Sequence, residues 1–417
     1  RMKQETLPSG VAKVMFGFCS WVVETAREKG LRRLYFLARD GYLLREISQM
    51  ICQKRGYDLS CRYLYASRLA WRLPACHLDY QEACRYVFSG ALRLTFRGMM
   101  SRIRADDSQC RMCARWAGIS EEQLDAPLPE EERKRIALLL ENERGFRLLL
   151  EEKSREAYDP VMIYLEQEGL MNGDPVALVD SGWTGGMQHT LRQLLESAGC
   201  HSPLIGFYFG LYTTPRVPAD GEYLAWYFSP RSPVRYAAMF NNNVLESLCT
   251  APHAMTVGYS VQQGWAVPEG KPPGKNRHFW QQRQSLLENC RQLADEYSPQ
   301  DAPVLLAQAR RWMKHLCCVP SPEEAAAIGG RLFCDDIAEG YLSPLAVPIS
   351  QSQAREYLVW NRRKARPGLY WPCGSLAVSP VRHRAWYRLH IYVWEALRIT
   401  RMKRRASHAV HRDHRHP

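Results

Sequence analysis

Residues 175–191 place the strongest constraint on the fold of this chain. Val176 to Val179 form a short, uninterrupted apolar run, which is typical of a strand buried on both faces of a parallel sheet. The run ends at Asp180, and a glycine-rich stretch separates it from residues 187–195, where apolar side chains recur at helical spacing. A second apolar run covers residues 203–212. The pattern predicts a strand, a glycine turn, a helix and another strand.

The turn after the first of these strands is a predicted ligand site. Ligands of open α/β sheets bind at the carboxyl ends of the strands. Glycine lets the backbone approach an anion, and the start of the next helix offers free N–H groups and a positive dipole end. The predicted ligand-binding residues are Ser181, Gly182, Trp183, Thr184, Gly185 and Gly186. A second interpretation, with equal weight, is that the glycines only make a tight turn.

A similar unit occurs near the start of the chain. An apolar strand at 34–37 is followed by a helix at 42–52 and by a strand at 62–66. Because the carboxyl ends of parallel strands meet at one edge of a sheet, the polar residues that follow these strands are expected to lie together. They are Arg39, Asp40, Gly41, Ser67 and Arg68.

The whole chain is predicted to be an α/β protein with a Rossmann-like parallel sheet. Residues 1–75 are its first part, 76–150 a helical cap insertion without strand signals, and 151–267 its second part with a hairpin. Helical patterns return at 277–365, and residues 381–417 form a basic amphipathic tail. We also expect a helix break near Asp159–Pro160, because proline disfavours the helical conformation of the residue before it.

Composition excludes several classes of protein. The chain has 417 residues and no run of the roughly 20 apolar residues that a membrane span needs. The 14 cysteines have no regular spacing, which favours reduced thiols in a cytoplasmic protein, and no signal peptide is visible. Cys110 and Cys113 form a lone CxxC, for which helix packing is favoured over zinc.

The tail carries its own prediction. Residues 381–417 hold ten Arg or Lys and two acidic residues, so they contribute +8 of the net charge of +13. Apolar residues recur at helical spacing through 384–405, and basic residues crowd the ends of this segment. Such a helix suits an anionic membrane surface, which would place the protein peripherally on the inner membrane face. The alternative is a helix docked on the domain, and nucleic acid is disfavoured because no motif supports it.

The strand ends resemble motifs of the haloacid-dehalogenase (HAD) superfamily. Residues 34–44 resemble its first motif, Tyr63–Ser67 its second and Val176–Gly185 its fourth, while Lys153 is suitably placed for the lysine of the third. More closely, Phe36-Leu-Ala-Arg-Asp-Gly-Tyr42 and Val179-Asp-Ser-Gly-Trp-Thr-Gly185 resemble a group of bacterial predicted HAD hydrolases. That group is associated with surface-polysaccharide and glycosyltransferase genes.

The resemblance implies a phosphorylated sugar or nucleotide sugar as ligand, with glycosyltransferases as partners. It also assigns roles to residues: Asp40, Asp180 and Lys153 are the candidate catalytic residues, and Asp40 and Asp180 would share a Mg²⁺ ion. Lys153, Arg39 and Arg68 would neutralise phosphate charge. The chain departs from the HAD pattern at Ala38, which occupies the position of the aspartate nucleophile. The implied activity is therefore a degenerate phosphohydrolase or phosphotransferase.

Other interpretations stay open. Asp40 can cap the following helix, Arg39 and Arg68 can form structural ion pairs, and Lys153 can be a solvated helix residue. Glu246 and His253 are weaker site candidates. The chain can also be a non-catalytic scaffold of glycosyltransferases or itself a glycosyltransferase. A phosphoribosyltransferase-like enzyme is a further alternative, because an Asp after an apolar strand followed by Thr-Gly-Gly resembles a ribose-phosphate loop.

Overall fold

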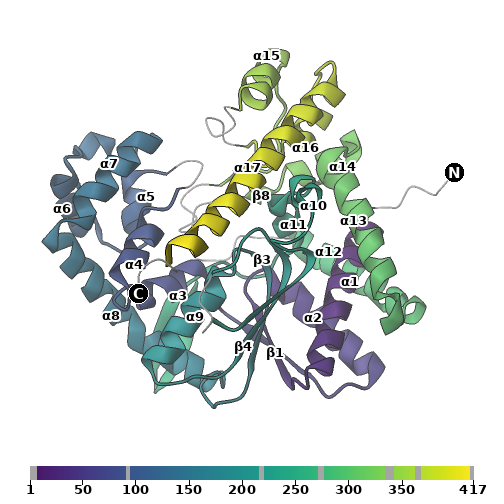
Figure 1. The fold of residues 1–417 in the computed structure, drawn as a ribbon, viewed down its shortest axis with the longest axis horizontal. Coiled ribbons are helices and arrows are strands. Elements are labelled where there is room, and N and C mark those ends of the chain that lie inside the picture. The colour runs from purple at the N-terminus through teal and green to yellow at the C-terminus, as the bar shows by residue number, and fades with distance from the viewer. Residues whose placement is uncertain are drawn as a thin grey trace.

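The computed structural model describes residues 7–90, 94–215, 220–270, 277–333, 342–361 and 368–413, with only the backbone for 277–281 and 406–413. Its centre is a five-stranded, all-parallel sheet with the strand order β2-β1-β3-β4-β5 (Figure 1). The strands are β1 (Arg33–Leu37), β2 (Ser60–Leu64), β3 (Val176–Trp183), β4 (Leu204–Leu211) and β5 (Glu222–Phe228). The predicted Rossmann-like α/β sheet is confirmed at this level.

Helices cover both faces of the sheet because its strands are apolar on both faces. On β1, Leu34 and Phe36 pack into a core with α1 (Leu7–Glu28) and α2 (Gly41–Arg55). The alternate residues Tyr35 and Leu37 pack into a second core on the opposite face, with side chains of α3 (Arg68–Ala75), α8 (Arg144–Gln167) and α9. Side chains of a strand alternate between faces, so a continuous apolar run supplies both cores. Helix α9 spans Gly186–Ser197.

The segment between β2 and β3 is helical, as predicted, and has a core of its own. In Figure 1, α5, α6 and α7 lie together to the left of the sheet. The elements of the segment are α3 (Arg68–Ala75), α4 (Tyr80–Val87), α5 (Phe96–Ser101), α6 (Asp107–Ala117), η1 (Glu121–Gln123), α7 (Glu130–Glu141) and α8 (Arg144–Gln167). Cys110 and Cys113 are buried in the core of this segment with free thiols, so they pack a helix as expected.

The predicted helix break near Pro160 is wrong, because α8 continues through it. The first half of α8 is held by the core of the insertion, through Phe146 and Leu150, and the second half by the sheet, through Val161 and Leu165. Burial on both sides of Pro160 offsets the one hydrogen bond that proline removes. As a result, α8 crosses the predicted domain boundary at residue 150 and connects the insertion to the sheet.

The rest of the chain packs around this centre. The expected hairpin is formed by β6 and β7, which pair antiparallel. Within the predicted helical region 277–365, a small sheet of β8 and β9 was not expected. The remaining elements are α10 (Val234–Ala238), α11 (Asn242–Leu248), β6 (Thr256–Gln262), β7 (Trp265–Gly270), α12 (Arg277–Glu296), η3 (Pro299–Asp301), α13 (Ala302–Cys318), α14 (Pro322–Gly329), β8 (Leu332–Phe333), β9 (Ser343–Pro344), α15 (Gln351–Ala354), η4 (Arg355–Val359), α16 (Pro372–Ala377) and α17 (Arg384–Asp413).

Several of these C-terminal helices contribute side chains to the same core as α1 and α2. Leu305 and Met313 of α13, together with Tyr387 and Ile391 of α17, belong to the same buried cluster as Phe36 of β1. The C-terminal region is therefore packed on the sheet domain. Among the residues that the structure describes, no helix is long and apolar enough to cross a membrane.

Candidate functional site

The strand order creates a natural ligand site between β1 and β3. The chain leaves β1 toward β2 on one side and returns to β3 on the other, so the connections diverge between these two strands. Such a topological switch point leaves a crevice at the carboxyl edge, where ligands of open α/β sheets bind. Asp40 lies three residues after β1, and Asp180 and Ser181 lie in the last half of β3. The predicted acidic residues therefore reach the edge on adjacent strands.

Ser181 connects the two predicted aspartates. Its hydroxyl donates a hydrogen bond of 2.5 Å to Asp40 Oδ2, and its backbone N–H donates one of 2.9 Å to Asp180 Oδ1. The Asp40 side chain thus accepts from the neighbouring strand and makes no capping bond to α2, whose first turn it precedes. The interpretation of Asp40 as a helix cap is wrong. Asp40 and Asp180, which the resemblance assigned to one metal ion, lie close together on either side of Ser181.

A third carboxylate enters the site from α11. Trp183 Nε1–H donates a hydrogen bond of 2.5 Å to Glu246 Oε1, and Asn242 Nδ2–H donates a longer one of 3.4 Å to the same oxygen. Trp183 belongs to the predicted turn, so its indole connects that turn to α11. The sequence indicated Glu246 only weakly, because its distance of 63 residues from Trp183 conceals the contact.

Burial raises the pKa of all three acidic side chains, and the charge of Glu246 adds to this effect on both aspartates. Burial is the main cause of the raised pKa of Asp40, and the nearby charges of Glu246 and Asp180 add to it. Burial also raises the pKa of Asp180 to about 7, with a further contribution from Glu246, and it raises the pKa of Glu246. Because burial and the charge of Glu246 oppose the ionisation of Asp40 and Asp180, a cation held by these two aspartates would stabilise their charged forms.

Two exposed arginines provide the opposite charge. Arg39 follows β1 and favours the charged forms of Asp40 and Glu246, and Arg68 begins α3 and favours those of Asp180 and Glu246. Both lower the pKa of the carboxyl groups, although less than burial raises it. The site therefore combines acidic groups with guanidinium groups, which bind phosphate oxygens well.

Ser67 has a structural role at this edge. Its hydroxyl accepts a hydrogen bond of 2.9 Å from Ala70 N–H, which caps α3, and donates one of 2.7 Å to the carbonyl of Thr256 on β6. The hydroxyl proton is thus used to hold the hairpin against α3. The interpretation of Ser67 as a turn residue explains these contacts, and its predicted ligand role stays a prediction.

The glycines of the turn are required by the backbone itself. Gly182 has φ +135°, and a Cβ atom there would lie 2.1 Å from the carbonyl oxygen of Gly210 on β4. Gly185 has φ +69° and precedes α9, which begins at Gly186. The turn interpretation therefore accounts for both positions, while their anion-binding role stays a prediction. Thr184, between them, is exposed to solvent.

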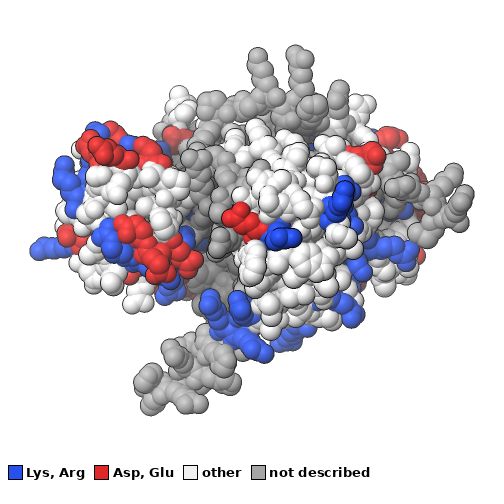
Figure 2. All heavy atoms as spheres, turned by 90° about the horizontal axis from the view of Figure 1, so that it is seen from above, with Lys and Arg blue, Asp and Glu red and all other residues white. Residues whose placement is uncertain are grey.

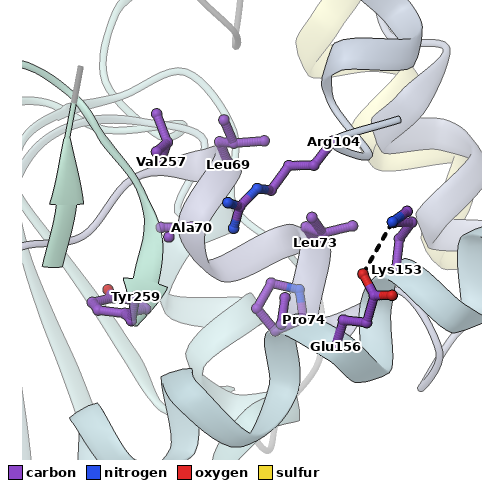
Figure 3. A pocket seen from close by; sticks show the side chains of 11 residues that line it. Leu69, Ala70, Leu73, Pro74, Arg104, Lys153, Glu156, Val257 and Tyr259 are labelled. Atoms are coloured by element: carbon purple, nitrogen blue, oxygen red, sulfur yellow. Dashed lines mark hydrogen bonds and ion pairs between the residues drawn. The ribbon is translucent and has the colours of Figure 1, made fainter. Parts of the chain in front are cut away.

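Lys153 lies in a different place from the acidic residues. It sits on α8 and forms an ion pair of 3.1 Å with Glu156. Both line a cavity of about 250 Å³ that also receives Arg104 and whose lining includes neither Asp40 nor Asp180 (Figure 3). Lys153 is a helix residue, but it is not solvated as the alternative interpretation expected, because its side chain is only 15% exposed. Its catalytic role stays a prediction.

Aromatic side chains beside Asp40 were missed by the sequence analysis. Tyr42, Tyr63 and Tyr65 pack edge to face, and Tyr63 Oη is hydrogen bonded to His253 Nε2 at 2.7 Å. Burial, followed by the charge of Arg39, lowers the pKa of His253. The signal in the sequence was the alternation of Tyr63, on β2, with Tyr65, which directly follows that strand, because residues two apart in extended chain point to the same face.

The side chains present suit a magnesium ion held by few protein ligands. Among the residues that the structure describes, no group of three or more His, Cys, Asp or Glu side chains is arranged to hold a metal. Mg²⁺ usually binds one or two carboxylates and completes its shell with water and phosphate oxygens. Asp40 and Asp180, joined through Ser181, match that requirement.

Comparison with known proteins assigns no family. No protein-family model matches the chain, and no curated protein matches it either. The resemblance to HAD hydrolases consequently stays a prediction from sequence motifs.

Proposed function

We propose that this protein is a degenerate HAD-like protein that binds a phosphorylated sugar or nucleotide sugar together with Mg²⁺. The observation that carries the proposal is the convergence of Asp40 and Asp180 on Ser181 at the switch point of the sheet. Asp40 and Asp180 would hold the metal, which would neutralise phosphate charge. Arg39 and Arg68 would bind the remaining phosphate oxygens.

Binding is a better-supported role than covalent catalysis. A HAD phosphotransferase forms an aspartyl phosphate, and the methyl group of Ala38 offers no oxygen for that bond. Any hydrolysis would therefore have to proceed by direct attack of water, without a covalent intermediate on the protein.

A non-catalytic role is the second candidate, and Ala38 is the observation that favours it. In that case the site would sense a sugar phosphate while the chain serves as a scaffold for glycosyltransferases. Both candidates belong to cell-surface polysaccharide assembly, with the protein on the cytoplasmic face of the inner membrane. The polysaccharide setting rests on the motif resemblance, and the membrane location rests on the basic amphipathic tail.

Removal of either metal-binding carboxylate should abolish metal-dependent ligand binding. With Mg²⁺, a nucleotide sugar or sugar phosphate at 100 times its Kd should stabilise the protein by about 2.7 kcal/mol. We expect this stabilisation to disappear in Asp40→Asn and Asp180→Asn, because an amide carries no charge to hold Mg²⁺. Thermal unfolding with each ligand, with and without Mg²⁺, measures the effect.

The matched control is Asp58→Asn. Asp58 is exposed and precedes β2, at the amino edge of the sheet. It should keep the full ligand-induced shift. An unchanged shift in both site variants would show that the site assignment is wrong. Release of phosphate by the wild type, but not by the two site variants, would show that the protein is a hydrolase.

The pKa of Asp180 also predicts a pH dependence. Its raised value of about 7 means that the carboxyl group holds a proton below neutral pH, and a metal must displace that proton. Mg²⁺-dependent affinity should therefore fall as pH decreases below 7, by about tenfold per pH unit for one displaced proton. Calorimetric titrations at pH 5.5, 6.5 and 7.5, at about equal ionic strength, would test this. An affinity that stays constant across this range would contradict the role of Asp180.

A further inference from the structure

Helix α17 is apolar on two opposite faces. Tyr387, Ile391 and Ile399 are buried against the body of the protein. On the other side, four large apolar residues are exposed in the sequence order Trp386 (46%), Leu389 (56%), Val393 (43%) and Leu397 (42%). Packing on the sheet domain explains the first set. The second set stays exposed, and the ring contacts of Trp386 are with Tyr387 and His390 of the same helix.

The four exposed residues form one stripe. Their spacings of three, four and four residues place them within an arc of about 80°, at about 100° per residue of helix. We call these four residues the α17 stripe. The helix runs diagonally across the upper part of the molecule in Figure 1. In Figure 2, which shows the molecule from above, Lys and Arg side chains gather at the lower edge of the central part, and a few charged side chains lie within it.

Basic residues lie at both ends of the stripe. Arg401, Arg404 and Arg405 are exposed beyond Leu397, and the helical period places Arg404 in line with the stripe. Arg382 is exposed just before the helix begins. Glu395 is the one acidic residue in 384–405, and it forms an ion pair of 2.7 Å with Arg398. The exposed face is therefore apolar along its length and positive at its ends.

We propose that the α17 stripe lies on an anionic lipid bilayer, with the helix axis parallel to the surface. The apolar side chains would enter the boundary between headgroups and acyl chains, while the arginines would contact anionic headgroups. This inference rests on α17 and does not depend on the ligand site. It requires no membrane-spanning segment, in agreement with the hydropathy of the described helices.

Charge favours this occupant over a second copy of the chain. In an antiparallel pair centred on Val393, Arg404 of one stripe would approach the Arg382 end of the other, and a parallel pair would align identical arginines. Arginines brought close together in this way would repel each other and oppose association of two copies. An anionic surface would instead neutralise their charge. Nucleic acid would match the arginines and would leave the Leu and Val side chains of the stripe exposed.

Vesicle sedimentation with the full chain tests the proposal. Wild-type protein should bind vesicles of phosphatidylglycerol and phosphatidylcholine, and bind pure phosphatidylcholine vesicles at least about tenfold more weakly, given the contribution of each arginine. The double variant Leu389→Ser/Leu397→Ser should lose at least about tenfold in binding, because it removes apolar surface that enters the bilayer. Arg401→Gln/Arg404→Gln should bind more weakly and should show a smaller dependence on salt.

Two control variants change the same residue types on the helical insertion. Leu138→Ser/Leu148→Ser alters exposed leucines of α7 and α8, and Arg85→Gln/Arg115→Gln alters exposed arginines of α4 and α6. Both should bind anionic vesicles like the wild type, and circular dichroism should show native helix content in every variant.

Three results would overturn the proposal. Wild-type protein could fail to bind anionic vesicles, or both stripe variants could bind them as well as the controls do. Light scattering could also show a wild-type dimer that becomes a monomer in Leu389→Ser/Leu397→Ser, in which case the stripe is an interface between two copies. Loss of ligand-induced stabilisation would leave the vesicle result unaffected, so the two proposals fail independently.

Discussion

Gly182→Ala should lower the free energy of unfolding by more than about 3 kcal/mol and weaken the ligand site. A φ of +135° is strained for alanine by about 1–3 kcal/mol, and a Cβ atom 2.1 Å from the Gly210 oxygen forces β3 away from β4. Gly182 pairs directly with Gly210 in the sheet, so the displacement reaches the end of β3, where Asp180 and Ser181 lie. Urea unfolding, monitored by circular dichroism, measures the loss of stability.

Gly173→Ala is the control that separates the cost of backbone strain from the cost of a steric clash with a neighbouring strand. Gly173 has φ +90°, and an added Cβ atom would meet no atom within 4 Å. This control should lose about 1–2 kcal/mol through strain alone and should keep the ligand-induced thermal shift. If Gly182→Ala and Gly173→Ala were equally stable and both bound ligand, the close approach of β3 and β4 would not be what requires glycine at position 182.

His189→Ala should be the most destabilising change outside the strand ends. His189 on α9 lies between two carboxylates: Nδ1 is 2.9 Å from both oxygens of Asp220, and Nε2 is 3.0 Å from Glu82 on α4. Asp220 is fully buried and also accepts a hydrogen bond of 3.0 Å from Tyr223. Removal of the imidazole would leave a buried charge without its cation, which costs about 3–5 kcal/mol.

An exposed pair of the same chemistry provides the control. His315 on α13 lies 2.9 Å from Glu324 on α14, and its side chain is 41% exposed. Ion pairs in contact with water contribute roughly 0–1 kcal/mol, so His315→Ala should have a small effect. Equal losses in the two variants would show that the burial of Asp220 does not determine the strength of the His189 contacts.

The triad of Glu82, His189 and Asp220 also predicts how the free energy of unfolding changes with pH. Hydrogen bonds to Asp220 and then to Glu82 raise the pKa of His189 to about 10, whereas the unfolded chain has the ordinary value of 6.5. A raised pKa means that this stabilisation is complete below pH 6.5 and is lost as pH rises through about 10. The difference in stability between wild type and His189→Ala should therefore shrink from pH 6.5 to pH 10.5. A difference that stays constant would contradict a charged His189.

The triad also shows why parts of the structure could not be predicted. Glu82, His189 and Asp220 are separated by 107 and 31 residues, and each looks like an ordinary polar residue in its own segment. They meet because the insertion packs against α9 and the chain entering β5. Glu246 lies at the acidic site for a similar reason. Val244 and Leu245 of α11 pack into the core and fix the position of the helix, and this position brings Glu246 to the site.

Local patterns were sufficient for the strands of the central sheet, for its parallel type and for the position of the candidate site. Apolar runs on β1, β3 and β4 require burial on both faces, and this leads to a parallel sheet with helices on either side. Because the carboxyl ends of such strands share an edge, the closeness of Asp40 and Asp180 followed from their places in the sequence. Pro160 shows the limit of local rules, since burial on both sides of it kept α8 continuous.

The sequence by itself determined which residues follow the strands and that the C-terminal helix carries an apolar stripe, because both depend on periods of two and 3.6 residues along the chain. Only the tertiary structure decided the direction in which each side chain points. In the folded protein, Asp40 accepts a hydrogen bond from Ser181, and Lys153 forms an ion pair with Glu156. On α17, Leu389 is exposed and Ile391 is buried. Those outcomes depend on contacts between segments far apart in the chain, where packing selects one neighbour among many that the sequence allows.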